Sequence, residues 1–582
     1  PGFVPRRAQQ HLAVAVADTF EQREVLLAEA GTGTGKTYAY LVPALRSGLK
    51  TIISTGTRAL QDQLYHRDLP RVREALGTSL RSALLKGRAN YLCLYRMHQA
   101  KGDAQFTSPA QASQFQRIVA WSGRTRAGDM AELEGLADDS PLLPLVTSTV
   151  DNCLGSDCPF WEECFVVQAR QRAQAADLVV VNHHLLLADL ALKQEGFGEI
   201  LPGAQAFVID EAHQLPELAA SFFGEGFGMR QIQELARDCL AECKQTTGAL
   251  AVLQAPVRAL EQALRDLRAA MEALPPRGTR YRALTLPAVA DGFDVLADSL
   301  GALEPALEPL VESSPGFEAC LARVRELGGR LERWRDGAVA SDAFADEVAD
   351  DAALQVAAKS RGPRLHGGDG VDGRGDDGAG GDEGVPFDPA TQARTAARGG
   401  EVYWYELSPR GFRCQRTPLD VSAPLRQHRE QSRAAWVFTS ATLAVGGGFQ
   451  HVGRKLGLFD PDTLLEPSPF DWPRQALCYL PRDLPEPNTR EFGAAMLAAV
   501  RPVLEASGGR ALLLFGSHRA LRGAAQAMPS APWPLLVHRD PPIVDLLRRF
   551  RESGNGVLLG SATFREGVDV AGDALSVVVI DK

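Results

Sequence analysis

The sequence predicts an α/β protein built on parallel sheets, and three observations support this fold class. Short apolar runs alternate with helical stretches, a pattern that favours parallel strands joined by helices. A glycine-rich turn joins one apolar run to a helix at residues 29–37, and Asp-Glu-Ala-His follows another run at residues 210–213. The predicted strands are Val25–Ala28, Thr51–Ser54, Leu178–Val181, Phe207–Ile209, Ala435–Thr439, Arg510–Phe515 and Val557–Leu559.

The first strand leads into Glu-Ala-Gly-Thr-Gly-Thr-Gly-Lys-Thr, and the helix Tyr38–Leu45 follows. Glycines in such a turn leave backbone N–H groups uncovered, so that these groups can converge on phosphate oxygens. Lys36 is placed to reach the terminal phosphates, and the Thr37 hydroxyl is placed to complete the shell of a magnesium ion. The predicted phosphate-binding residues are Gly31, Thr32, Gly33, Thr34, Gly35, Lys36 and Thr37. This pattern predicts a nucleoside triphosphatase.

The second nucleotide motif is an acidic pair that follows the strand Phe207–Ile209. A triphosphatase needs two carboxylates with different roles. Asp210 is predicted to hold magnesium, and Glu211 is predicted to polarise the attacking water. Two adjacent acids suit this chemistry because one binds metal while the other accepts a proton. The predicted catalytic residues are therefore Lys36, Asp210 and Glu211.

Length and charge set the broad organisation. A chain of 582 residues exceeds what one hydrophobic core serves, so three or four domains are expected. The formal charge is −10, but residues 342–383 hold eleven acidic and four basic residues and therefore carry −7 of it. The net charge thus does not exclude a polyanionic partner. Residues 362–384 are rich in Gly and Asp and are predicted to be a disordered linker or insertion.

No apolar run approaches the length of a membrane span, and the first residues lack the apolar region of a signal peptide. The sequence therefore predicts a cytoplasmic protein with no membrane partner.

Four of the nine cysteines, Cys93, Cys153, Cys158 and Cys164, lie between the two nucleotide motifs. In a cytoplasmic protein such a set favours metal binding over disulfides. Four thiolates can hold zinc or an iron–sulfur cluster. The wide gaps favour the cluster, and zinc remains the alternative, with unliganded thiols a third. Cys239 and Cys243, at helical spacing, are predicted to be core residues.

Taken in order, these motifs resemble the iron–sulfur helicases of superfamily 2, the XPD/DinG group, and within it the YoaA-type branch. The resemblance also includes Phe3, Arg6 and Gln9 at three-residue spacing, Ile53–Thr57, Ala59–Leu64, Leu85–Cys93, Val179–His184, Thr439–Leu443 and Glu566–Asp569. It implies two RecA-like motor domains, the second one truncated, an inserted iron–sulfur domain and a helical arch. It also implies a 4Fe-4S cluster and Mg²⁺ as cofactors and ATP as the substrate.

The domain boundaries that follow are expectations. Motor domain 1 is predicted in three parts, 1–85, 176–220 and 400–445. The cluster domain is predicted at 86–175, the arch at 221–399 and motor domain 2 at 446–582.

The resemblance assigns further site residues one by one. It implies that Gln9 reads the adenine edge and that Ser440 and Thr442 couple hydrolysis to domain movement, and it places Asp569 with the nucleotide. Thr55 and Thr57 are expected to donate hydrogen bonds to phosphates of single-stranded DNA, which carry no sequence information.

Four further residues are predicted at the DNA surface. Lys86 and Arg88 supply cations for phosphates, and Tyr91 supplies a ring for stacking. The alternative is a solvated loop in which the tyrosine fills the cluster pocket. His183 is the fourth, although adjacent histidines after an apolar run can simply close a strand.

The resemblance implies an ATP-dependent DNA helicase that moves 5′-to-3′ on single-stranded DNA and unwinds forked substrates in repair or replication. A clamp-loader accessory subunit of the replisome is a predicted partner. One alternative is a DNA-stimulated translocase that does not unwind, and another is a non-catalytic nucleic-acid-binding fragment. An exonuclease is disfavoured because only 28 residues precede the glycine-rich motif. The family's final arginine motif is not among the printed residues, so weak hydrolysis is expected of this polypeptide.

Overall fold

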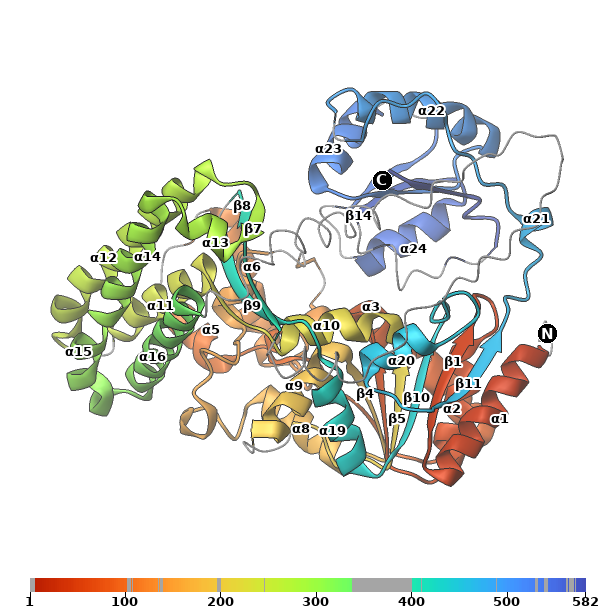
Figure 1. Ribbon diagram of the computed structural model, residues 1–582, viewed down its shortest axis with the longest axis horizontal. Helices are drawn as coiled ribbons and strands as arrows, with labels where there is room; N and C mark the ends of the chain where they lie inside the picture. The colour runs from red at the N-terminus through yellow and green to blue at the C-terminus, as the bar shows by residue number, and fades with distance from the viewer. Residues whose placement is uncertain are drawn as a thin grey trace, which may run out of the picture. The chain divides into compact units, whose positions relative to one another are not determined.

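The computed structural model describes residues 6–581 except 102–105, 107, 134, 137–139, 196–199, 245, 338–399, 410, 488, 529–531, 539–542, 562–563, 565–569 and 571. The described chain divides into two compact units (Figure 1). Unit 1 contains residues 1–222 and 421–582, and unit 2 contains residues 223–420. The predicted Gly/Asp-rich segment 362–384 lies outside the described residues.

The larger sheet of unit 1 has seven strands, all parallel, in the order β11-β1-β10-β5-β2-β4-β3. Its strands are β1 (Val25–Ala30), β2 (Thr51–Thr55), β3 (Ser82–Leu84), β4 (Leu178–Asn182), β5 (Ala206–Asp210), β10 (Ala435–Ser440) and β11 (Asp462–Glu466). The five strands predicted in this part of the chain are confirmed, whereas β3 and β11 were not predicted.

Helices cover both faces of this sheet, as a parallel sheet with apolar strands requires. Ala435 and Val437 of β10 pack with helices α1 (Arg7–Gln22) and α2 (Lys36–Arg46). Trp436 and Phe438 point to the other face, toward α9 (His183–Glu195), α10 (Leu215–Phe222), α19 (Ser422–Ser432) and α20 (Gln450–Leu456). Alternation along the strand therefore explains why β10 is apolar at every position from 435 to 438.

The chain between β3 and β4 forms helices and turns and holds the four clustered cysteines. Its helices are α5 (Leu94–Lys101), α6 (Pro109–Ser122), α7 (Leu143–Val146) and α8 (Phe165–Ala175). The predicted insertion at 86–175 falls within this segment, and its status as a separate domain stays a prediction.

A second parallel sheet forms near the C-terminal end, in the order β13-β14-β12-β15. Its strands are β12 (Ala511–Phe515), β13 (Leu535–Val537), β14 (Val557–Ser561) and β15 (Val577–Ile580), and its helices are α22 (Phe492–Ser507), α23 (His518–Ala527) and α24 (Ile543–Ser553). Two parallel sheets with helices confirm the predicted α/β class.

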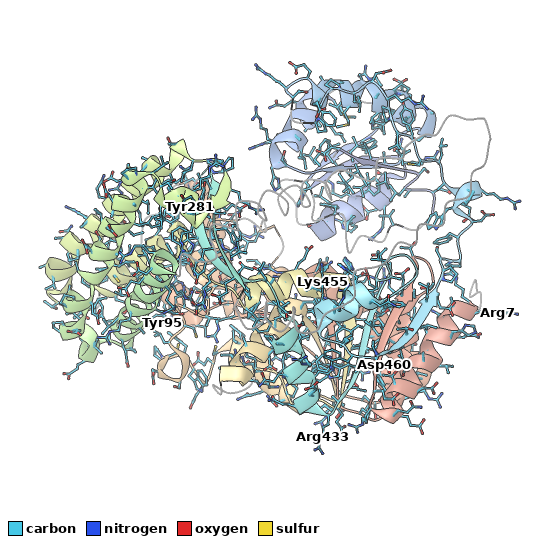
Figure 2. The ribbon with its side chains drawn as sticks, in the orientation of Figure 1. Arg7, Tyr95, Tyr281, Arg433, Lys455 and Asp460 are labelled. Carbon is cyan, nitrogen blue, oxygen red and sulfur yellow. The ribbon has the colours of Figure 1, made fainter. Side chains whose placement is uncertain are left out.

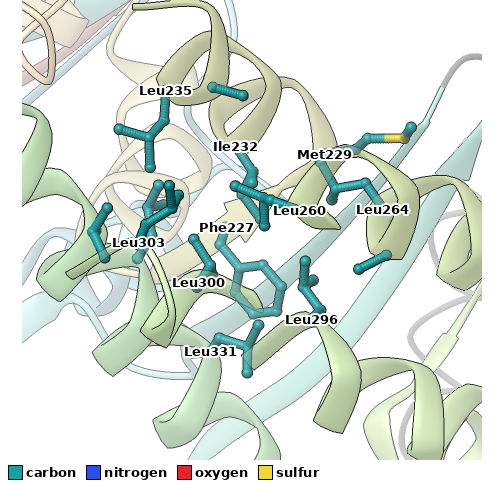
Figure 3. Close-up of a cluster of buried hydrophobic side chains, with 14 of the residues drawn as sticks. Phe227, Met229, Ile232, Leu235, Leu260, Leu264, Leu296, Leu300, Leu303 and Leu331 are labelled. Carbon is teal, nitrogen blue, oxygen red and sulfur yellow. The ribbon is translucent and has the colours of Figure 1, made fainter. Parts of the chain in front are cut away.

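Unit 2 combines helices with a four-stranded antiparallel sheet in the order β6-β9-β8-β7. The helices are α11 (Met229–Glu242), α12 (Ala249–Ala270), α13 (Arg280–Leu284), α14 (Pro287–Gly301), α15 (Glu304–Leu307) and α16 (Pro315–Asp336). The strands are β6 (Glu225–Gly228), β7 (Arg277–Thr279), β8 (Glu401–Ser408) and β9 (Gly411–Pro418). Figure 3 shows leucines of several helices closing around Phe227, a fully buried ring.

Two predicted boundaries are wrong. Residues 401–418 were assigned to motor domain 1, but β8 and β9 pair with β6 and β7 of unit 2. Residues 462–466 were assigned to motor domain 2, but β11 pairs with β1. Both errors have one cause: a strand's partner is chosen by long-range pairing, which local composition does not encode.

No helix among the described residues combines the length and apolar character needed to cross a membrane.

Candidate nucleotide site and cysteine pocket

The order of the large sheet brings three motifs to one edge. β1, β10 and β5 are neighbours, and their carboxyl ends precede the glycine-rich turn, Ser440 and the acidic pair. The register pairs Glu29 with Ser440 and Thr439 with Asp210. Motifs that lie about 400 residues apart in sequence therefore share one site because their strands are adjacent and parallel.

The glycine-rich turn is held by donors to its carbonyl oxygens. The Thr34 hydroxyl donates to Gly31 O at 2.9 Å, Ser468 Oγ to Thr32 O at 2.8 Å, Arg6 Nη1 to Gly33 O, and Gln9 Nε2 to Gly35 O at 3.1 Å. With four carbonyls engaged in this way, the turn presents its N–H groups to an anion. Gln9, predicted to read adenine, therefore lies against the turn itself.

Two glycines of the turn adopt a backbone conformation that disfavours other residues. The φ angles of Gly33 and Gly35 are +87° and +85°. An added Cβ would lie 2.3 Å from the Phe470 ring at Gly33 and 2.3 Å from Gln9 Nε2 at Gly35. Both the φ angle and the close neighbour therefore require glycine.

The acidic pair lies beside Lys36. Asp210 is buried, and its Oδ2 accepts a hydrogen bond of 2.9 Å from the Tyr40 hydroxyl. Burial, followed by the charge of Glu211, raises the pKa of Asp210 to about 6. Glu211 has a φ of +55°, and its Oε1 lies 3.9 Å from Lys36 Nζ. Two carboxylates and a cation thus meet where a phosphate and its metal are expected.

A polar chain links this pair to the end of β10. Ser440 Oγ donates to Glu211 Oε2 at 3.0 Å and lies 2.8 Å from His213 Nδ1. The N–H of Thr442 points to Ser440 Oγ at 3.4 Å. The Glu29 carboxylate accepts from the N–H groups of the next two residues, 443 and 444, at 2.5 and 2.6 Å. Hydrogen bonds therefore connect the end of β10 and the turn after it to Glu211 and to Glu29.

Tyr40 and Glu29 were not predicted, although each had a sequence signal. Tyr40 lies four residues after Lys36 and so shares its helix face. Glu29 is a charged residue within an apolar strand, and burial of a charge requires a partner. The remaining nucleotide-site prediction, Asp569, lies outside the described residues.

The predicted DNA-contacting threonines lie in the turn after β2. Thr57 caps helix α3 (Arg58–Gln63), because its side chain accepts from Leu60 N at 3.3 Å. Thr55 is buried, and its hydroxyl donates to Thr57 O at 3.3 Å. In this structure both hydroxyls therefore form hydrogen bonds within the turn and the first turn of α3.

The histidine prediction requires correction. His183 is fully buried, and its Nδ1 lies 2.7 Å from Ser54 Oγ. Burial lowers the pKa of His183 to about 3, so this imidazole is neutral at physiological pH. A neutral side chain inside the fold offers no contact to a DNA strand, and the strand-closing interpretation of this residue is favoured.

Lys86 and Tyr91 are also buried instead of exposed to a DNA strand. Lys86 is 4% exposed, and its Nζ lies 2.7 Å from both Asp62 and Asp129. Tyr91 is 4% exposed, and its hydroxyl accepts from Lys86 N at 3.0 Å. Residue type and spacing indicated a cation and a ring, but they could not show that carboxylates from α3 and the cysteine segment enclose the cation.

We expect Lys86→Met to destabilise the protein by about 3 kcal/mol, because it leaves two carboxylates without their shared cation. Denaturant unfolding measures this change. Lys455→Met, at an exposed lysine labelled in Figure 2, is the matched control and should change stability little. An affinity for single-stranded DNA that drops sharply in Lys86→Met at unchanged stability would restore the DNA-contact assignment.

The four cysteines line one cavity of about 40 Å³. Arg88 and Arg170 line it too, and among the described residues no acceptor lies within hydrogen-bonding distance of the buried Arg88 Nε. Burial and the charge of Arg88 lower the pKa of Arg170. In the described part of the chain, no three metal-binding side chains are placed to hold a single metal ion. The four cysteines that the sequence predicted as metal ligands thus line one cavity, and two positively charged side chains line it with them.

The fold and the motifs at the carboxyl ends of β1, β10 and β5 define a P-loop nucleoside triphosphatase. A DEAD/DEAH box helicase model matches residues 7–114, and a helicase C-terminal domain model matches residues 500–582. The chain is 39% identical to the ATP-dependent DNA helicase YoaA of Escherichia coli, and the match covers 100% of this chain and 82% of the relative. It is 31% identical to the ATP-dependent helicase DinG of Mycobacterium tuberculosis, with the same coverage. A solved XPD helicase matches with 14% identity and a TM-score of 0.48 over 100% of this chain and 85% of its own.

The chain belongs to the family of DNA helicases that includes YoaA and DinG.

Proposed function

We propose that this protein is an ATP-dependent DNA helicase that translocates on single-stranded DNA and unwinds forked duplexes. The observation that carries the proposal is the convergence of the glycine-rich turn, Asp210, Glu211 and Ser440 at one sheet edge. Identity of 39% to a named DNA helicase over the whole chain supports the same activity.

Each residue of the site has a defined task in hydrolysis. N–H groups of the turn and Lys36 bind the phosphates. Thr37 and Asp210 would hold Mg²⁺, which when bound would neutralise charge on the phosphate oxygens. Glu211 orients the attacking water and accepts its proton. The Ser440 hydroxyl holds the Glu211 carboxylate at 3.0 Å, so the position of this base depends on the turn after β10. A shift of that turn would therefore be coupled to hydrolysis.

Tyr40 positions the metal-binding carboxylate. Its hydroxyl donates to Asp210 Oδ2 at 2.9 Å inside the fold, which restrains the carboxylate to one orientation. We expect Tyr40→Phe to raise the Mg²⁺ concentration needed for half-maximal ATP hydrolysis about tenfold, as is usual when a ligand's hydrogen-bond partner is lost. A Mg²⁺ titration at saturating ATP measures this. Tyr65→Phe, which removes the partly buried hydroxyl that donates to Ser82 O, is the control.

The cysteine cavity supports a second proposal, a bound 4Fe-4S cluster held by Cys93, Cys153, Cys158 and Cys164. Arg88 and Arg170 would balance the negative charge of such a cluster, and its sulfur atoms would accept from the buried Arg88 Nε. When bound, the cluster would cross-link the segment between β3 and β4 and make it rigid. Zinc is the alternative, and iron and zinc analysis of the purified protein separates the two.

Several finer assignments remain predictions. They are 5′-to-3′ polarity, a role in repair or replication, a cytoplasmic location and a clamp-loader accessory subunit as partner. The domain boundaries, apart from the two corrected above, and the DNA-contacting role of Thr55, Thr57 and Arg88 are likewise part of the proposal.

Strand displacement on a duplex with a 5′ single-stranded tail tests the activity. We expect the full-length protein to release the labelled strand only with ATP and Mg²⁺, and Lys36→Ala to release none. A duplex with a 3′ tail tests polarity. DNA-stimulated ATP hydrolysis without strand release would favour the translocase, and absence of ATP hydrolysis in the full-length protein would favour a non-catalytic binder.

A further inference from the structure

The segment that follows β11 runs along the glycine-rich turn. Gly31 N donates to Glu466 O at 3.0 Å, and Ser468 Oγ donates to Thr32 O at 2.8 Å. A Cβ at Gly31 would lie 2.5 Å from Ser468 N. The two backbones are thus in direct contact, and residues 466–472 form one wall of the phosphate-binding turn.

This wall ends in two exposed aromatic rings. The Phe470 ring lies directly against Gly33, where an added Cβ would come within 2.3 Å of it. Its backbone N–H donates to Ser468 Oγ at 3.3 Å, so the serine that binds the turn also positions the ring. Phe470 is 39% exposed and Trp472 is 48% exposed, with ring centroids 5.1 Å apart. Large rings kept partly in water beside a polar turn suggest a ligand-binding role.

The beginning of α1 reaches the same place. Arg6 and Gln9 bind carbonyls of the turn, and His11 Nδ1 lies 2.8 Å from Glu466 Oε1. Three segments that are distant in sequence therefore meet at this end of the sheet: α1, the glycine-rich turn and residues 466–472. Amide and aromatic groups together can recognise the edge and the face of a base.

We propose that Phe470, positioned by Ser468 and flanked by Trp472, forms the surface on which the adenine of ATP stacks. This inference rests on the proposed binding of the triphosphate to the glycine-rich turn. The strand order disfavours DNA as the stacked ligand, since β2, which carries the threonine turn, is three strands away from β1 and about 14 Å distant at the usual spacing. An aromatic ring stacks on any base, so Phe470 contributes affinity and Gln9 is left to select adenine.

Comparison of two ligands tests the stacking surface. Isothermal titration calorimetry measures binding of ATP and of inorganic tripolyphosphate, which has the phosphates but no base. We expect Phe470→Ala in the full-length protein to weaken ATP about tenfold and tripolyphosphate less than about twofold, since only the base loses its stacking partner. Phe470→Trp should keep ATP affinity. Phe459→Ala, at a ring that is 72% exposed and lies under Arg426, is the matched control.

Each other result contradicts the inference. Unchanged ATP affinity in Phe470→Ala excludes stacking. Equal weakening of both ligands shows that the ring only shapes the turn, and tighter binding of both shows that it obstructs the site. Lys36→Ala should weaken both ligands, and if it weakens neither, the error lies in the proposed triphosphate site and the stacking surface falls with it. Thermal unfolding of each variant confirms that the protein is folded.

Discussion

Replacing Glu211 by Gln should lower the kcat for ATP hydrolysis about 10²- to 10⁴-fold, because the amide cannot accept the proton of the attacking water. Gln is close in size to Glu, and its oxygen can still accept the hydrogen bond from Ser440 that holds the side chain in place. Binding of ATP should therefore change little. Single-turnover hydrolysis and equilibrium ATP binding, measured on the full-length protein, separate the two effects.

Glu217→Gln provides the control, since Glu217 is an exposed acid six residues further on, in α10. It should hydrolyse ATP at the wild-type rate. A Glu211→Gln variant with a kcat within about twofold of wild type would remove Glu211 from the role of general base. The positive φ of Glu211 is kept in both forms, because Gln and Glu share the same backbone preferences.

On the proposed cluster assignment, replacing Cys158 by Ser should abolish binding of the cluster and lower strand displacement about tenfold or more, because a lost ligand removes folding energy as well as metal. The cavity that holds Cys158 also holds the other three clustered cysteines and two arginines. Loss of the proposed cluster would leave both arginines at this cavity without its negative charge. Iron content, visible absorption of anaerobically purified protein and strand displacement are the three measurements.

Cys478→Ser is the matched control, because Cys478 is exposed and lies far from this set in sequence. It should keep both iron and strand displacement. Full metal content and full unwinding in Cys158→Ser would show that the four cysteines do not act as one metal site. Zinc in place of iron would keep the metal-binding role of the cysteines and reject the iron–sulfur cluster.

Local pattern predicted where the motifs of the nucleotide site lie in the fold. The glycine-rich turn follows β1 and opens α2, and the acidic pair follows β5, as expected from apolar runs bounded by those motifs. These features are readable because each depends on a few consecutive residues whose backbone and side chains act together. Ser440 and Gln9 were predicted from the resemblance. In the structure Ser440 donates to Glu211 of the acidic pair, and Gln9 donates to the glycine-rich turn.

Exposure was the weakest part of the prediction. Lys86, Tyr91 and His183 have the right chemistry for a DNA surface, yet all three are buried in the fold. Lys86 is enclosed by Asp62 and Asp129, which lie 24 residues before it and 43 residues after it. A pattern of residue types does not reveal such partners, because they are supplied by other segments once the chain has folded.

The amino-acid order alone therefore specified the α/β class, the phosphate-binding turn, the acidic pair and a cysteine set between them. Only the folded chain showed that β11 pairs with β1 and carries Phe470 to Gly33, that β8 and β9 belong to unit 2, and that Tyr40 holds Asp210. The reason is physical. Short motifs act through neighbouring residues, whereas strand pairing and side-chain burial depend on contacts between segments that the sequence keeps far apart.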